Sequence, residues 1–315
     1  MNDDIAYVMA VGRRGTLKKT YHLMKSIKHF DKDAEIYAFV ANEEVDEIPQ
    51  ASLDRFKPYS KLIYGNIPMK EYIFTVKHQA LIQAGEISSK KYLACMDSDM
   101  LMFDKLQLEE GYDLFVAPVD IGNTSWGRLD AKPEWKRLYG LIGEDMPDYT
   151  LTSLVDKREM LPYFNGGLAI TSDHKFGKLW LETTKKIFPE ISDKDSYIEG
   201  YSKKTAHGKL VTKIPFSHWT EQVTLSLLAS KFNTKILDYT YNYPMNIMWD
   251  CPTDIKIMHY HDLRNLIKIR NKAVKQKIVD MGIKEALDGY NKCDTYARLL
   301  AYHTLRSIKI KAGKF

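Results

Sequence analysis

The sequence predicts an α/β domain built around a parallel sheet. Residues 5–11 form an apolar run of strand length, residues 16–30 repeat apolar side chains every three or four positions, and residues 35–40 form a second strand-like run. A strand, a helix and a strand at this spacing are typical of a parallel pair with a crossover helix. Residues 92–96 and 112–119 are mostly apolar without alternation, which is typical of strands that are buried on both faces.

The composition allows one large domain or two smaller ones. The chain has 315 residues, of which 44% are apolar and 12% aromatic, so a sizeable core is available. No apolar stretch is long enough to cross a membrane, and the acidic residues 1–4 lack the features of a signal peptide. Cys95, Cys251 and Cys293 are too few and too scattered for a disulfide framework. We therefore expect a cytoplasmic protein with reduced thiols.

Positive charge is concentrated at the end of the chain. The net charge is +5, and residues 263–315 carry 13 Lys or Arg against 4 Asp or Glu, so this segment contributes +9 and the rest −4. We expect a main domain at residues 1–262 and a basic helical extension at residues 263–315. An amphipathic segment around Leu299 and Arg306 could lie on an anionic bilayer or pack on the domain. Nucleic acid is not expected, because no binding signature accompanies these charges.

Two carboxylates, Asp97 and Asp99, lie between apolar stretches. Carboxylates are rarely buried without a partner. At the point where a strand gives way to a loop, both could approach one divalent cation that also binds a diphosphate. A buried salt bridge or a turn is the alternative. The same D-x-D pattern at residues 31–33 and 193–195 has polar neighbours, which favour solvated turns.

The stretch around these carboxylates resembles the metal-binding D-x-D strand of GT-A fold glycosyltransferases, most of all the family-8 type (glycogenin and bacterial galactosyltransferases). The matches described below extend the resemblance over residues 5–262. It implies a mostly parallel sheet flanked by helices, and a nucleotide-sugar donor with UDP as the expected nucleotide. Asp97, Ser98 and Asp99 would bind the donor, and Asp97 and Asp99 would hold Mn²⁺ or Mg²⁺ on its diphosphate.

Two upstream features fit this resemblance. The first predicted strand ends in a turn where Gly12 would let the backbone approach a base or ribose. The resemblance implies that Val11 and Gly12 contact the nucleotide, and a plain surface turn is the alternative. Residues 75–86 form a predicted helix in which Lys77 matches a basic position near the diphosphate. An exposed helix lysine is the alternative there.

Two regions are expected to be irregular. Residues 120–160 are punctuated by Gly and Pro, and we expect them to shape the acceptor side. Their Trp126 and Trp135 could stack on sugar or form a small local core. Residues 190–213 are rich in Lys, Ser and Gly, which indicates a mobile loop. Such a loop would close over the donor and exclude water, or remain a plain surface loop.

Consecutive glycines open the apolar strand predicted at residues 163–170. Glycines are costly in a strand unless the backbone has to approach something closely. The segment resembles the F-N-x-G strand of GT-A enzymes, which implies that Asn165, Gly166 and Gly167 face the donor sugar. A β-bulge capped by Asn165 is the alternative.

Glu221 and Gln222 open a predicted helix, ahead of an apolar stretch. The pair resembles the D-Q helix start of family-8 enzymes, with Glu221 where that family usually has Asp. Glu221 would be the general base of an inverting enzyme. In a retaining enzyme, which is favoured, Glu221 and Gln222 would line the sugar and stabilise positive charge. The alternative is an acid that complements the helix dipole.

A short strand predicted at residues 255–258 delivers His259 at its end. Neutral imidazole is a suitable Mn²⁺ ligand beside two carboxylates, and the segment resembles the family's YN…IxHY pattern, whose His is the third metal ligand. His261 is the second choice, and a strand-end His without a ligand is the alternative. The family's Gly-x-x-Lys-Pro-Trp sequence is absent here, so Arg264 or Lys268 would supply the phosphate-binding cation.

These segments together predict a metal-dependent glycosyltransferase that moves a sugar from a nucleotide-diphosphate donor to a hydroxyl of an oligosaccharide or glycolipid. Asn165, Glu221 and Gln222 would act on the reacting face of the sugar. Two other classes stay open: a nucleotidyltransferase acting on a sugar phosphate, and a non-catalytic glycan- or membrane-binding protein on the same scaffold. Fold alone does not distinguish them; the polar clusters at strand ends favour transfer.

Overall fold

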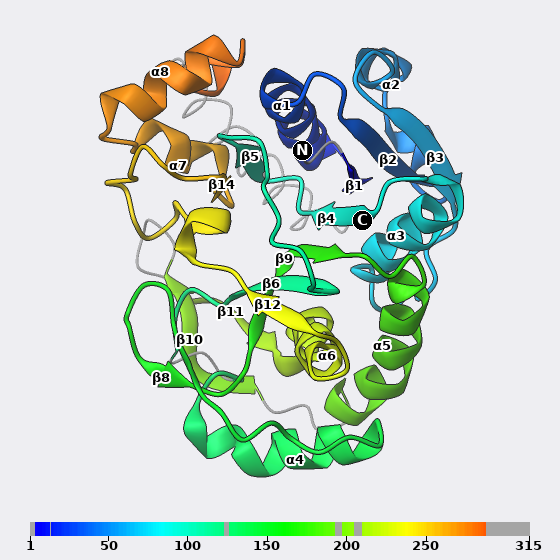
Figure 1. Ribbon diagram of the computed structural model, residues 1–315, viewed down its shortest axis with the longest axis vertical. Helices are drawn as coiled ribbons and strands as arrows, with labels where there is room; N and C mark the ends of the chain where they lie inside the picture. Colours follow the sequence, from blue (N-terminus) through cyan, green and yellow to red (C-terminus); the bar gives the residue numbers. More distant parts are fainter. Residues whose placement is uncertain (1–3, 13, 123–125, 193–196, 205–209, 288–315) are drawn as a thin grey trace, which may run out of the picture.

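The computed structural model describes residues 4–12, 14–122, 126–192, 197–204 and 210–287. The strands of its central sheet are β1 (Ile5–Val11), β2 (Glu35–Ala41), β3 (Lys61–Gly65), β4 (Tyr92–Met96), β6 (Leu114–Pro118), β9 (Phe164–Thr171) and β12 (Thr234–Ile236). Their order across the sheet is β12-β6-β9-β4-β1-β2-β3 (Figure 1). All of these strands run in one direction except β9, which is antiparallel to both its neighbours.

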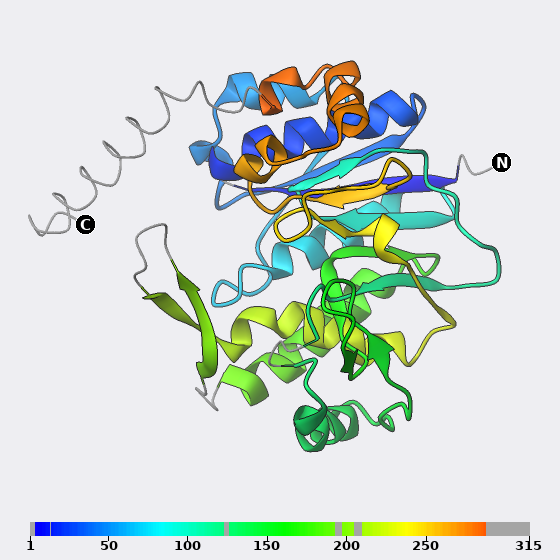
Figure 2. The ribbon, with the colours of Figure 1, turned by 90° about the vertical axis from the view of Figure 1, so that its left-hand side faces the viewer.

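Helices cover both faces of this sheet (Figures 1 and 2). They are α1 (Arg14–Phe30) and α2 (Gln50–Phe56) on one face, and α3 (Thr75–Ile87), α5 (Phe176–Ser192) and α6 (Thr220–Ala229) on the other. Side chains alternate along a strand, so Tyr7 of β1 joins the core under α1, whereas Val8 joins the core under α3. The predicted fold class, a mostly parallel sheet flanked by helices, is confirmed.

A third core lies beside the carboxyl end of β4. Its small sheet contains β5 (Met100–Met102), β13 (Tyr243–Pro244) and β14 (Ile257–His259). Packed with it are α7 (Leu263–Ile267), α8 (Lys272–Asp280) and the 3₁₀ turn η5 (Lys284–Ala286). Figures 1 and 2 both show this C-terminal segment beside α1, and Lys25 of α1 donates a hydrogen bond to the carbonyl of Gly282. The predicted amphipathic segment around Leu299 lies outside the described residues.

The prediction of a loop at residues 190–213 was wrong. The helix α5 continues to Ser192, and β10 (Tyr197–Lys204) pairs with β11 (Leu210–Pro215) as an antiparallel hairpin. A two-stranded ribbon does not need two apolar faces, so a sequence rich in Lys and Ser still forms strands. Composition alone therefore misled the prediction.

The region from 120 to 160 is more regular than expected. It contains α4 (Lys132–Leu141), the 3₁₀ turn η2 (Leu129–Ala131) and the short pair β7 (Leu151–Thr152) and β8 (Glu159–Met160). Trp126 and Trp135 are buried, and the Trp135 indole donates to the carbonyl of Trp126 at 2.8 Å. The alternative of a local core is confirmed for these two residues.

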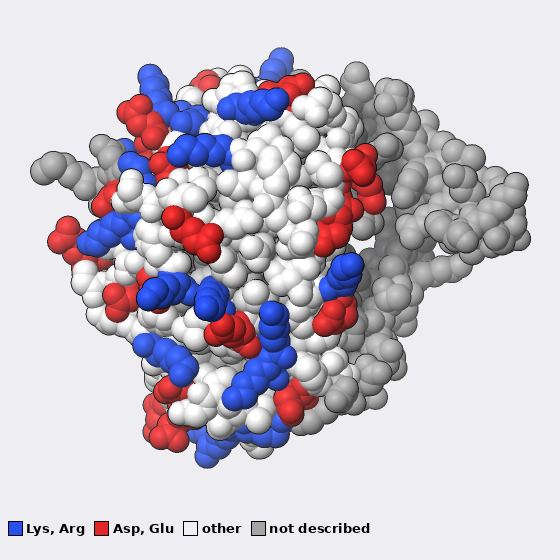
Figure 3. All heavy atoms as spheres, turned by 90° about the vertical axis from the view of Figure 1, so that its right-hand side faces the viewer, with Lys and Arg blue, Asp and Glu red and all other residues white. Residues whose placement is uncertain are grey.

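Three further 3₁₀ turns complete the described elements: η1 (Val45–Glu47), η3 (Phe216–Trp219) and η4 (Tyr239–Tyr241). Within the part of the chain that the structure describes, no helix has the length and apolar character needed to cross a membrane. On the face drawn in Figure 3, Lys and Arg side chains are interspersed with Asp and Glu.

Candidate functional site

The carboxyl edge of the sheet brings together most of the predicted site residues. Asp97 follows β4, and its N–H donates to the carbonyl of Gly167 at 2.8 Å. Because β9 is antiparallel to β4, its first residues lie at the edge where β4 ends. The parallel strand β1 ends at the same edge with Val11, followed by Gly12. Sheet topology thus unites segments that are far apart in the sequence.

Gly166 and Gly167 occupy positions where a side chain would not fit. A Cβ atom on Gly166 would lie 2.5 Å from Oε1 of Glu221, and one on Gly167 would lie 2.8 Å from Cε1 of His259. The Asn165 side chain accepts a hydrogen bond from the Gly167 N–H at 2.8 Å, and the pairing of β9 with β6 shifts register here. The pairing is therefore irregular next to these glycines, and this irregularity coexists with a close approach to two predicted site residues.

Asp99, His259 and His261 form a cluster of possible metal ligands. Their ligand atoms all lie within 4.8 Å of one another. Nε2 of His259 is 3.2 Å from Oδ1 of Asp99, and the rings of His259 and His261 stack with centroids 3.8 Å apart. Two ligands bonded at about 2.1 Å and at a right angle lie about 3 Å apart, so the first distance suits neighbours on one ion. One carboxylate and two imidazoles are donors that divalent transition metals accept, Mn²⁺ among them.

The surroundings of His259 support this fit. His259 lies opposite Met100 in the antiparallel pair of β14 and β5, which places it next to Asp99. Its Nδ1 is 3.1 Å from Oδ1 of the buried Asn242, so Nε2 is the nitrogen that faces Asp99. Nε2 of His261 is buried and has no hydrogen-bond partner among the described residues. Such an unpartnered atom is expected where a ligand binds.

The charges of this cluster are mutually stabilised. Burial raises the pKa of Asp99, but its hydrogen bond with His259 and the nearby positive charges outweigh burial and hold that pKa below its ordinary value. Burial lowers the pKa of His259, and the hydrogen bond and charge of Asp99 outweigh it and raise that pKa. Both shifts favour the charged forms of Asp99 and His259 when no metal is bound, and a metal would replace the imidazole proton.

Asp97 has a different partner. Its carboxylate contacts the ammonium of Lys77, which is also 2.7 Å from Oε1 of Glu221 and 3.1 Å from the carbonyl of Gly166. Lys77 is buried, so the alternative of an exposed helix lysine was wrong. The pKa of Glu221 is raised to about 7, because burial and the charge of Asp97 together outweigh the opposing effect of Lys77. The cluster of Asp97, Lys77 and Glu221 is a second charged group at the same edge.

The other predicted residues lie around these two groups. Gln222 is half-buried beside Gly166, and Ser98 is half-buried in the turn between β4 and β5. Arg264 donates to Asp262 from Nε at 2.9 Å and from Nη2 at 2.6 Å. The ammonium of Lys268 lies 5.1 Å from the centre of the Trp249 ring. Arg264 and Lys268 thus have partners away from Asp99.

Three contacts of this site were not foreseen from the sequence. Nζ of Lys19 is 3.3 Å from Oδ2 of Asp99, Oδ2 of Asp120 is 3.8 Å from Nε2 of His261, and Asn242 holds His259. Asp120 follows a buried strand just as Asp97 does, so the same signal could have found it. Lys19 had no such signal, because a lysine on an amphipathic helix is usually solvated.

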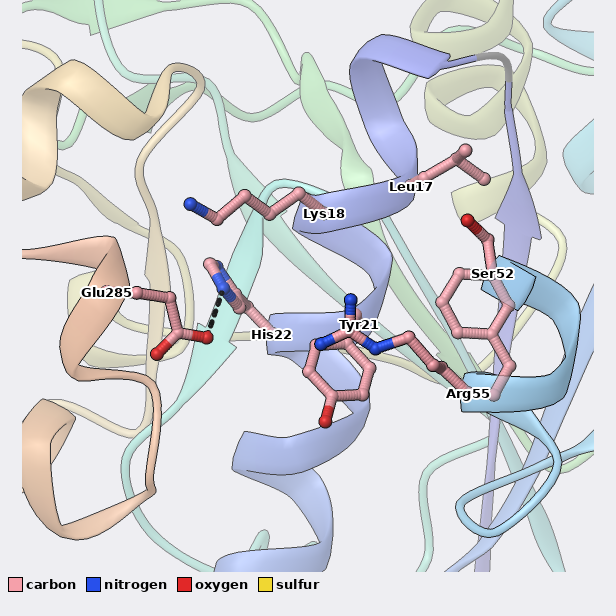
Figure 4. Close-up of a pocket in the computed structure, with 8 residues that line it drawn as sticks. Leu17, Lys18, Tyr21, His22, Ser52, Arg55 and Glu285 are labelled. Carbon is pink, nitrogen blue, oxygen red and sulfur yellow. Dashed lines mark ion pairs between the residues drawn. The ribbon is translucent and has the colours of Figure 1, made fainter. Parts of the chain in front are cut away.

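A separate pocket of about 360 Å³ lies on the outer side of α1 (Figure 4). Its lining residues are Leu17, Lys18, Tyr21, His22, Ser52, Arg55, Phe56 and Glu285. Nε2 of His22 lies 3.3 Å from Oε1 of Glu285, a contact that joins α1 to η5. None of the predicted site residues lines this pocket. It is therefore separate from the candidate site at the carboxyl edge of the sheet.

Comparisons with known proteins give a family and a set of structural neighbours. The model of the Rhodobacterales glycosyltransferase domain matches residues 8–199. No curated protein matches the chain. Among solved structures, the glycosyltransferase GlyE of Streptococcus pneumoniae TIGR4 aligns over 81% of this chain with 16% identity and a TM-score of 0.44. Its apo form aligns over the same share with 15% identity and a TM-score of 0.43. The chain spans 54% of the length of each of these structures.

Proposed function

The chain belongs to the Rhodobacterales glycosyltransferase domain family, and we propose that it transfers a sugar from a UDP-linked donor to a hydroxyl of an oligosaccharide or glycolipid in a metal-dependent reaction. Glycosyl transfer follows from the family. The UDP-linked donor, the metal dependence and the acceptor class are proposed here and do not follow from the family. Family-8-like specificity belongs to the same proposal and rests on the motif resemblance alone.

The observation that carries the metal dependence is the cluster of Asp99, His259 and His261, whose ligand atoms lie within 4.8 Å of one another. A divalent cation such as Mn²⁺ held there would neutralise charge on the departing diphosphate. Asp97 and Ser98 adjoin this cluster, and Asp97 is the further carboxylate that a donor-bound state would recruit. Lys77 holds Asp97 in place until then.

The reacting face of the sugar would lie against Asn165, Gly166 and Glu221. Glu221 would act as a base in an inverting enzyme, or together with Gln222 it would stabilise positive charge at the anomeric carbon in a retaining one. Retention is favoured because Glu221 is 5% exposed and already bonded to Lys77. A base for an incoming hydroxyl needs a freer approach from the acceptor side.

Nucleotide release tests this proposal. UDP released from UDP-glucose and UDP-galactose is measured with Mn²⁺, and again after EDTA is added. We expect release with Mn²⁺ for at least one donor, and its loss with EDTA. A nucleotidyltransferase would instead release pyrophosphate from UTP, and a binding protein would release nothing. Release that persists in EDTA would contradict the metal dependence.

The variant Asp99→Asn addresses the ligand cluster directly. It removes a charged ligand while keeping the side-chain volume, so we expect Mn²⁺-dependent turnover to fall by at least about 100-fold with an unchanged circular dichroism spectrum. The matched control is Asp130→Asn, because Asp130 is exposed and pairs with Arg128 on the surface. Full activity of Asp99→Asn would remove the metal role of this residue.

A further inference from the structure

Lys19 of helix α1 contacts two members of the candidate metal cluster, Asp99 and His261. Its Nζ is 3.3 Å from Oδ2 of Asp99 and donates to the carbonyl of His261 at 2.5 Å. The ammonium also lies 5.9 Å from the centre of the Tyr260 ring. A single positive charge on α1 thus contacts two of the three residues that offer ligands to a divalent ion.

The backbone at His261 is arranged around this contact. His261 has φ = 57°, in the left-handed region that costs a non-glycine residue of the order of 1 kcal/mol or more. The hydrogen bond that Lys19 gives to its carbonyl offsets part of that cost. Non-glycine residues in this conformation are enriched where a site is preorganised. The turn that presents the His261 ring is therefore held by Lys19.

Other basic side chains near the strand edge have different partners. Lys77 is buried between Glu221 and Asp97, and Arg264 makes a two-point contact with Asp262. Lys19 differs because its carboxylate contact, Asp99, belongs to the cluster with His259 and His261. Its side chain is 19% exposed, which leaves it in reach of a ligand that enters from solvent.

We propose that Lys19 is the resident cation of this site and the residue that receives the donor diphosphate. In the absence of a divalent ion, its ammonium neutralises Asp99 and holds the His261 turn. When an ion takes Asp99, the ammonium exchanges that carboxylate for a phosphate oxygen, since a lysine reaches phosphate as a flexible point charge. This inference rests on the proposed function, because it takes a nucleoside diphosphate as the ligand.

Two binding measurements on the full chain test the exchange. Mn²⁺ binding without nucleotide is followed by the loss of the free-ion electron paramagnetic resonance signal, and UDP binding in saturating Mn²⁺ by calorimetry. In Lys19→Met no ammonium competes for Asp99, so we expect Mn²⁺ to bind roughly fivefold tighter. The same variant lacks the phosphate contact, so UDP should bind about tenfold more weakly. These opposite signs separate an exchanging lysine from one with only a structural role.

Two further variants serve as controls. Lys19→Arg keeps the charge and should retain most of the UDP affinity. Lys18→Met removes the neighbouring lysine, which is exposed and lines the pocket on the outer side of α1, and should match the wild type in both measurements. If Lys19→Met does not fold, Lys19→Gln replaces it in the same two measurements.

The outcomes distinguish this inference from the proposed function. A wild type that binds Mn²⁺ and UDP, together with a Lys19→Met variant of equal affinity for either one, would overturn the role of Lys19 and leave the proposed function intact. A wild type that binds neither would overturn both. Tighter Mn²⁺ binding combined with weaker UDP binding in Lys19→Met is the supporting result.

Discussion

At the residue scale, the site depends on positions that tolerate one residue type. Gly167 is such a position, because any side chain there would meet His259 and Asn165 within 3 Å. The sequence flagged Gly167 correctly as a place of close approach, since paired glycines in a strand need a reason. The approaching groups proved to be parts of the protein itself. Contact with a donor sugar at the same place remains a prediction.

His78 gives a residue-scale prediction about pH. Its ring is fully buried against Trp180, with centroids 4.5 Å apart, and burial, followed by the charge of Lys77, lowers its pKa to about 3. Between pH 6.5 and 3 the unfolded chain binds a proton at this imidazole that the folded chain does not, so stability falls as the pH falls through this range. Above pH 6.5 the imidazole is neutral in both states and contributes no pH dependence.

The measurement is urea unfolding of the wild type and His78→Gln at pH 7.5 and 5.5. Between pH 7.5 and pH 5.5 the free energy of unfolding of the wild type should fall by about 1.4 kcal/mol because of His78. The fall in His78→Gln should be smaller by about 1.4 kcal/mol. The comparison at pH 7.5 controls for the packing cost of the substitution. An identical loss in both proteins would contradict the buried neutral imidazole.

At the element scale, α4 shows where pattern and structure diverge. The predicted loop region contains this helix because Trp135 and Leu138 pack into the core at helical spacing, a signal that the surrounding Gly and Pro obscured. Gly140 lies inside α4 and Gly143 follows the helix with φ = +75°. A side chain is thus compatible with the backbone at Gly140, whereas the left-handed backbone at Gly143 disfavours one.

The matched variants Gly140→Ala and Gly143→Ala test this element. A Cβ atom at Gly140 has nothing within 4 Å, so alanine should raise the free energy of unfolding by about 0.5–1 kcal/mol, by lowering the entropy of the unfolded chain. At Gly143 alanine should lower it by about 1 kcal/mol, because a left-handed backbone disfavours a side chain. Chemical denaturation measures the free energy of unfolding of each variant. Equal effects of the two substitutions would contradict a helical backbone at Gly140 and a left-handed one at Gly143.

At the scale of the whole molecule, the described residues after 262 form part of a hydrophobic core that also includes earlier segments of the chain. Leu266, Val274 and Ile278 are fully buried together with Leu101 and Met258. The expected boundary at residue 262 therefore falls within a packed region among the described residues. The separate helical extension at residues 263–315 stays a prediction.

The variant Ile278→Ala tests how strongly this core is coupled to the rest. It should lower the free energy of unfolding by about 2–4 kcal/mol and shift the transition of the whole protein. The matched control is Ile267→Ala in the same segment, where the side chain is 43% exposed and the change should be about 0.5 kcal/mol or less. A separate low-stability transition in Ile278→Ala, with the main transition unmoved, would show an independent extension.

The sequence by itself determined the order and type of the main elements and the residues of the two principal motifs. Strand and helix formation follow from local apolar patterns, so β1, α1, β2, α3 and β4 were predicted within a few residues of their observed bounds. Asp99 and His259 were predicted as neighbours, and the structure places them 3.2 Å apart. The hairpin of β10 and β11 was missed because polar strands lack an apolar pattern.

Only the tertiary structure decided which groups neutralise each carboxylate. Asp97 pairs with Lys77, whereas Asp99 pairs with Lys19 and His259, although the two acids are separated by one residue. The reason is geometric: the turn after β4 directs the two side chains toward different elements, which the order of strands in the sheet has brought there. Such partners lie up to 160 residues away along the chain, where no local pattern can specify them.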